Sequence, residues 1–92
     1  MATRGILNTV RKLAEIDAVV LGEHAVTDSM IDDDVTFDDV KHVLANAVEA
    51  IAQDDVGLKW KVYGPLVNDA EYAVVVNVRT DHLYVVTCHT PP

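Results

Sequence analysis

Apolar residues recur every three or four positions near the start of the chain and at every second position near its end. Residues 3–16 follow the helical spacing behind Thr3, whose side chain can cap a helix N-terminus, so we predict a helix over this range. The apolar positions of this helix are Ile6, Leu7, Val10, Leu13 and Ile16.

The longest helical pattern begins after Thr36. Thr36 is a suitable N-cap, and Asp38 and Asp39 lie in the first turn, where the helix dipole favours negative charge. The pattern predicts a helix from Phe37 to about residue 52. Its apolar stripe consists of Phe37, Val40, Val43, Leu44, Ala47, Val48 and Ile51.

Two shorter segments precede this helix. Residues 18–21 form an apolar run that ends at Gly22, and we interpret this run as a strand. Residues 23–33 are predicted to form a short helix, although the acids at its end are unfavourable for the helix dipole.

The last third of the chain predicts a β-meander. Apolar and polar side chains alternate over residues 58–63, which places Trp60 on the buried side of a strand. Residues 72–78 and 83–89 are two further strands, and the short links between them imply antiparallel pairing. We therefore predict an α+β fold, with two to three N-terminal helices packed on a C-terminal antiparallel sheet.

The predicted strand around residues 73–76 is apolar at consecutive positions. Such a strand needs cover on both faces of the sheet. The helix after Thr36 can cover one face, and the other requires the N-terminal helix, a second copy or another protein. We predict self-association or a protein partner on this basis.

Length and composition fit one intracellular domain over residues 1–92. Half of the residues are apolar, which argues against disorder. Cys88 is the single cysteine, so a disulfide-stapled secreted scaffold is excluded and a reducing cytoplasm is expected. The N-terminal residues lack the apolar core of a signal peptide, and no run suggests a membrane span.

The formal charge of −8 is concentrated in the middle of the chain. Residues 22–56 contain ten acids against Lys41 alone, whereas residues 57–92 are balanced. Phosphate contacts need clustered cations, so we do not expect non-specific nucleic-acid binding over the whole surface. A local basic patch on the sheet remains open.

Several sites are excluded by spacing. An EF-hand starting at Asp32 would need Gly at its sixth position and Glu at its twelfth, where the chain has Phe37 and Val43. The four histidines lack metal-ligand spacing, so we predict no metal and no cofactor. Cys88 and His89 would point to opposite sides of a strand, and we expect Cys88 to pack as a buried hydrophobe.

One group of side chains fits RNA. Lys59, Lys61 and Tyr63 project from one side of their strand, and Thr87 and His89 share one side of the last strand. Cations beside an aromatic ring suit a phosphate backbone and base stacking. An ordinary solvent-facing strand explains the same lysine pattern.

Short motifs follow one another in a recognisable order: Gly22-Glu23-His24-Ala25, Val35-Thr36-Phe37-Asp38-Asp39-Val40, Lys61-Val62-Tyr63-Gly64 and Leu83-Tyr84-Val85-Val86-Thr87-Cys88-His89. This order resembles a family of small uncharacterised bacterial domains, with a His-Ala helix and a final Val-Val-Thr strand, that is related to RelE/ParE-type toxins. The resemblance spans residues 18–90 and leaves residues 1–17 as an additional N-terminal helix.

The resemblance implies a RelE-like fold and metal-independent mRNA cleavage, held in check by an antitoxin. Basic and acid–base side chains would deprotonate a ribose 2′-hydroxyl and stabilise the phosphorane. The candidate catalytic residues are His24, Lys61, Tyr63, Arg79 and His89. The chain departs from the family pattern because Asp28, Asp32 and Asp33 stand where arginines are usual.

Two hypotheses follow. The first is a RelE-like endoribonuclease of a toxin–antitoxin system, with RNA and an antitoxin-like protein as partners. The alternative is a catalytically inert interaction domain on the same fold, which binds a partner through its acidic segment or an apolar sheet face.

Overall fold

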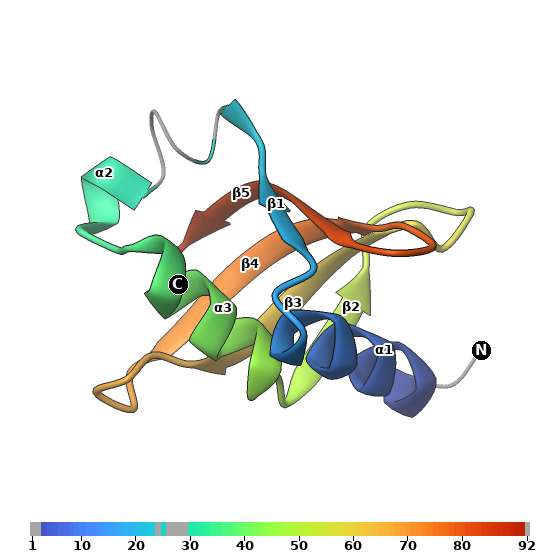
Figure 1. Cartoon of the computed structure of the whole chain (residues 1–92), viewed down its shortest axis with the longest axis horizontal. Helices are drawn as coiled ribbons and strands as arrows, with labels where there is room; N and C mark the ends of the chain where they lie inside the picture. Colours follow the sequence, from blue (N-terminus) through green and yellow to red (C-terminus); the bar gives the residue numbers. More distant parts are fainter. Residues whose placement is uncertain (1–2, 24, 26–29, 92) are drawn as a thin grey trace.

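The computed structural model describes residues 3–23, 25 and 30–91 (Figure 1). Within these residues the helices and strands follow one another along the chain. They are α1 (Thr3–Glu15), β1 (Val19–Leu21), α2 (Met30–Asp33), α3 (Phe37–Ala45), β2 (Glu49–Ala52), β3 (Lys59–Pro65), β4 (Glu71–Val78) and β5 (Leu83–His89).

The five strands form one mixed sheet in the order β1-β5-β4-β3-β2. Strands β3, β4 and β5 are the predicted antiparallel meander, and β2 extends it antiparallel to β3. The expectation of a purely antiparallel sheet is wrong at one edge, because β1 pairs parallel to β5. Strand β1 therefore lies at one edge of the sheet, and β2, the next strand along the chain, lies at the opposite edge.

The helices α1 and α3 lie on the same face of the sheet (Figure 1). Val10 of α1 and Val40, Val43 and Leu44 of α3 are fully buried, so the N-terminal helix belongs to the same core as the rest. The helix α3 packs closely on β3, because a Cβ added at Gly64 would lie 2.4 Å from the carbonyl oxygen of Val43. The core on the sheet side includes Trp60, Val62, Tyr72, Val74, Val76, Leu83, Val85 and Cys88.

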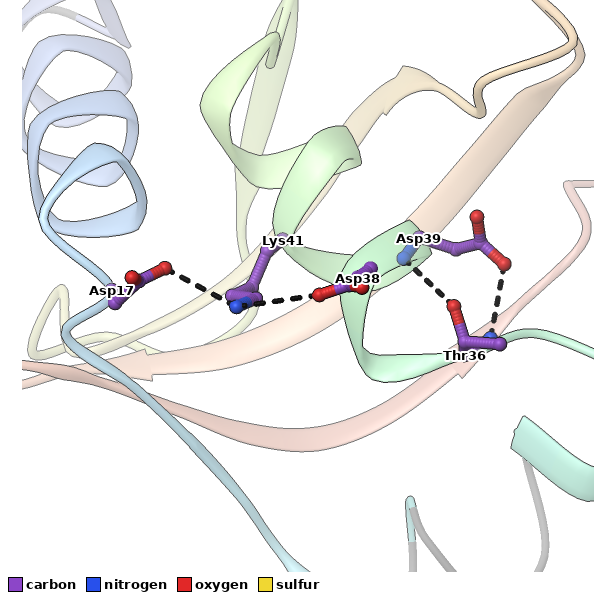
Figure 2. A network of polar contacts seen from close by, with 5 residues as sticks. All are labelled: Asp17, Thr36, Asp38, Asp39 and Lys41. Carbon is purple, nitrogen blue, oxygen red and sulfur yellow. Dashed lines mark hydrogen bonds and ion pairs between the residues drawn. The ribbon is translucent and has the colours of Figure 1, made fainter.

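The predicted helix from Phe37 to residue 52 is wrong in its second half. Its start is confirmed, because Thr36 and Asp39 form a reciprocal capping box (Figure 2). The helix ends at Ala45, where the side chain of Asn46 donates to the carbonyl of His42. Residues 49–52 form β2 instead, and the side chains of Val48 and Ile51 are exposed.

A distant residue helps to end this helix. The guanidinium of Arg11 in α1 donates two hydrogen bonds, of 2.8 and 2.6 Å, to the carbonyl oxygen of Ala47. In a continued helix that oxygen would accept from the amide of Ile51. The amide of Val48 instead donates to Tyr63 in β3, so tertiary contacts replace the hydrogen bonds that a longer helix would make.

Strand β4 is buried on both faces, as its sequence predicts. Val74 and Val76 are 0% exposed on the helix side, while Ala73 and Val75 are 0% and 7% exposed on the other side. This cover exists within one chain, so the burial of β4 does not itself require a second copy. Self-association stays a prediction.

The short helix predicted over residues 23–33 is described only in part. α2 covers Met30–Asp33, whereas residue 24 and residues 26–29 lie outside the described part of the chain. The end of α2 is joined to the sheet because the hydroxyl of Tyr72 donates to Asp33 at 2.6 Å.

Candidate functional site

The candidate site lies on the sheet face opposite α1 and α3, which we call the open face. Strand pairing sets side chains of neighbouring strands in two rows across it. One row contains Glu49, Tyr63, Ala73 and His89, and the next contains Ile51, Lys61, Val75 and Thr87. Three of the predicted site residues, Lys61, Tyr63 and His89, therefore share this face.

A bulge in β5 decides which side chains face outward. Val76 pairs with Val85, but Val75 pairs with Thr87, so Val86 is an extra residue between them. A one-residue shift moves every later side chain to the other face. Because of this shift Cys88 points into the core and His89 onto the open face.

Tyr63 and His89 flank Ala73 on either side. Adjacent strands lie about 4.8 Å apart, so the Cα atoms of Tyr63 and His89 are roughly 10 Å apart. Ala73 is small and fully buried although no described helix packs on this face, which indicates that flanking side chains lean over it. Lys61 lies one row along, with its Nζ 5.9 Å from the centre of the Tyr63 ring.

One hydrogen bond sets the tautomer of His89. Its Nδ1 lies 3.0 Å from the carbonyl oxygen of Thr90. A carbonyl oxygen can only accept, so Nδ1 carries the proton and neutral His89 has its lone pair on Nε2. That nitrogen can accept a proton from a bound molecule.

The other two predicted residues do not join this group. Arg79 follows the last residue of β4, whereas the Tyr63–His89 row crosses β4 at Ala73. Six residues of a strand span about 20 Å, so the structure does not bring Arg79 to His89. His24 lies outside the described residues.

On the strands β2, β3 and β4, basic and acidic side chains of the open face balance each other. Lys59 and Lys61 project from it along β3, and Glu49 and Glu71 occupy the same face on the neighbouring strands. The lysines and Tyr63 are half-buried, because their apolar parts lie along the sheet. The face is thus a mixed surface of cations, aromatic rings and carboxylates.

A polar cluster on the helix side of the sheet carries no signal in the sequence and was not predicted. Tyr72, Asp33 and the buried thiol of Cys88 meet where α2 approaches β4 and β5. Burial, reinforced by the hydrogen bond to Asp33, raises the pKa of the Tyr72 hydroxyl well above its usual range. Burial also raises the pKa of the Cys88 thiol, which suits an inert packing role rather than a nucleophile.

The negative charge of the acidic segment, residues 22–56, is only partly balanced by Lys41. Lys41 lies 3.2 Å from Asp17 and 3.5 Å from Asp38, and Figure 2 shows it directed away from Asp39. These contacts raise the pKa of the Lys41 ammonium, the hydrogen bond with Asp17 being the largest cause. Within the described ranges no three His, Cys, Asp or Glu side chains are grouped so that they could hold a metal ion.

Comparisons of the chain with protein-family models, with curated proteins and with solved structures find no match. No helix in the described part of the chain is long and apolar enough to span a membrane.

Proposed function

We propose that this domain binds RNA through the open face of its sheet and cleaves it without a metal, as a RelE-like endoribonuclease. The observation that carries the proposal is the convergence of Lys61, Tyr63 and His89 in two adjacent rows of one face. They come from β3 and β5, so only the folded sheet unites them.

Each of the three side chains has a distinct role in this proposal. Tyr63 offers a ring on which a base can stack, and the ammonium of Lys61 lies close enough to that ring to contact the adjacent phosphate. His89 offers Nε2 as the proton acceptor.

The proposed reaction is an intramolecular transesterification of the RNA backbone. The ribose 2′-oxygen attacks the adjacent phosphorus as its proton passes to Nε2 of His89, and Lys61 stabilises the negative charge of the phosphorane. The bond from phosphorus to the 5′-oxygen then breaks. The leaving oxygen takes a proton from water, and the resulting hydroxide takes the proton held on Nε2 of His89. The products are a 2′,3′-cyclic phosphate and a 5′-hydroxyl, and His89 is neutral again.

The alternative is a catalytically inert interaction domain on the same fold. Two observations favour it, because each weakens the binding of a phosphate. Arg79 lies far from His89, and the carboxylates of Glu49 and Glu71 share the open face. The two functions differ in a measurable product.

The decisive experiment compares two histidine variants on RNA, with and without ribosomes. His89→Gln should lower cleavage about 10²–10⁴-fold, the usual contribution of a general base. His82→Gln is the matched control, since His82 lies in the β4–β5 turn and contacts Asp81. Cleavage should survive EDTA. A wild-type protein that cleaves no RNA in either setting would leave only the inert interaction domain.

Binding is measured separately from cleavage. Lys61→Ser should weaken binding of a labelled single-stranded RNA and lower its salt dependence, because one phosphate contact is lost. Lys12→Ser in α1 removes the same charge away from the open face and should change neither. Equal effects of the two variants would mean that the open face is not the binding surface.

A further inference from the structure

A groove on the helix side of the molecule combines apolar walls with carboxylates. It consists of two adjoining hollows of about 350 and 320 Å³, which share Asp34 and Val35. The connection from α2 to α3 forms one wall, and Leu66 and Val67 of the β3–β4 turn form part of the other.

The apolar part of this groove is open to solvent. Ile31 and Val67, at its two sides, are each 70% exposed, and Val35 and Leu66 are half-buried between them. Large aliphatic side chains exposed around a hollow favour contact with another apolar group.

Among the residues that the structure describes, no lysine or arginine forms an ion pair with the carboxylates that line this groove. Asp33, Asp34 and Asp39 line the larger hollow. The hydroxyl of Tyr72 donates to Asp33, and the amide of Thr36 donates to Asp39. These donors are neutral, so the negative charges stay. Lys41, the cation of this segment, is directed at Asp17 and Asp38 instead (Figure 2).

We propose that this groove binds a segment of another protein that carries lysine or arginine beside a large aliphatic residue. The carboxylates would receive the cation, and Val35, Leu66 and Val67 would receive the aliphatic side chain. The acidic segment of a second copy, residues 22–56, does not supply such an occupant, because it would meet like charge in the groove. The groove contains none of the residues of the open face, so this proposal does not depend on RNA binding.

The probe is a short labelled peptide in which lysine and leucine alternate with serine, titrated against the full chain. A second peptide replaces leucine by serine, and a third replaces lysine by glutamate. The first should bind more tightly than the other two, because only it supplies both the charge and the apolar contact. Equal binding of the first two peptides would overturn the proposal, since it would reflect bulk charge attraction alone.

Paired variants locate the contact. Asp34→Asn should weaken binding about two- to fivefold, the size of an exposed charge pair, and asparagine tolerates the positive φ of 55° at this position. Asp55→Asn removes the same charge outside the groove and should have no effect. Val67→Ser should also weaken binding several-fold, whereas Val56→Ser, at a position that is 74% exposed elsewhere, should not.

Amide shifts of the labelled protein provide an independent map. Peptide addition should shift residues 31–39 and 66–68 and leave β3 and β5 unchanged. Shifts spread over the whole acidic surface, or equal losses in the two variants of either pair, would overturn the proposal. Loss of RNA cleavage with peptide binding intact would instead count against the function of the open face alone.

Discussion

The two faces of β4 are both apolar and both buried, yet different structures cover them. Val74 and Val76 face α3 and the rest of the core, where helices fill the space above the sheet. Ala73 and Val75 face the other way, between side chains of β3 and β5. A residue's burial alone therefore does not tell whether it belongs to a packed interior.

The difference matters for function. Where α1 and α3 pack on the sheet, the side chains between them are closely packed, held in fixed positions and leave no room for a ligand. Lys61 and Tyr63 shield β4 with apolar parts while their polar ends stay in water. The side chains of the open face can therefore cover Ala73 and Val75 in the free protein and still move when a molecule binds.

The largest expected difference between the faces is at β3. Trp60→Ala should lower the free energy of unfolding by about 3–5 kcal/mol, because Trp60 is 8% exposed under the helices. Tyr63→Ala, on the open face of the same strand, should cost clearly less. Urea denaturation measures both costs. Circular dichroism is the probe, because Trp60 is the only tryptophan and Trp60→Ala removes the tryptophan fluorescence. Equal costs would mean that the open face is packed like the core.

A smaller effect is expected from the hydroxyl of Tyr72. Tyr72→Phe should cost about 1.5–3 kcal/mol, because the hydrogen bond to the Asp33 carboxylate is lost. Tyr63→Phe is the control on the open face and should stay within about 0.5 kcal/mol.

The same hydroxyl makes stability depend on alkaline pH. The pKa of Tyr72 is raised in the folded protein, so above about pH 10 the unfolded chain loses this proton first. This contribution to stability is complete below pH 10 and declines as the pH rises further. The decline should be shallower in Tyr72→Phe, as measured by urea midpoints at several pH values. An unchanged slope would contradict the burial of this hydroxyl.

The smallest difference concerns an added methylene. Val74→Leu should cost about 1–3 kcal/mol, because the helix-covered face has no space for it. Val75→Leu should change stability by no more than about 0.5 kcal/mol, since half-buried neighbours can move outward. Thermal melting distinguishes the pair, and the strand propensities of the two changes are the same. A comparable loss for Val75→Leu would show that the open face is rigid.

The meander was predictable because its signal is local. Alternation over residues 58–63 and the valine-rich runs that follow give β3, β4 and β5 with small errors at their ends. Trp60 was correctly expected in the core. Short links between the strands then leave antiparallel pairing as the simple solution.

The segment after Asn46 was not predictable in the same way. Ala47, Val48 and Ile51 continue the helical spacing, but β3 offers the backbone a ladder and Arg11 binds the carbonyl of Ala47. These partners lie far away in sequence, so no local pattern contains them. Tertiary contacts overrode the local helical preference.

In the candidate site, too, some positions could be predicted from the sequence and others depend on tertiary structure. The sequence by itself determined that Lys61 and Tyr63 share one side of a strand, since side chains alternate with a period of two. Strict alternation in β5 would place His89 with Leu83 and Val85 in the core, and only the bulge at Val86 turns it to the open face. The bulge arises from pairing between strands, and so do the rows that join His89 to Tyr63 and separate both from Arg79. Periodicity fixes what each strand presents, whereas register, which depends on two strands at once, is decided only in the folded molecule.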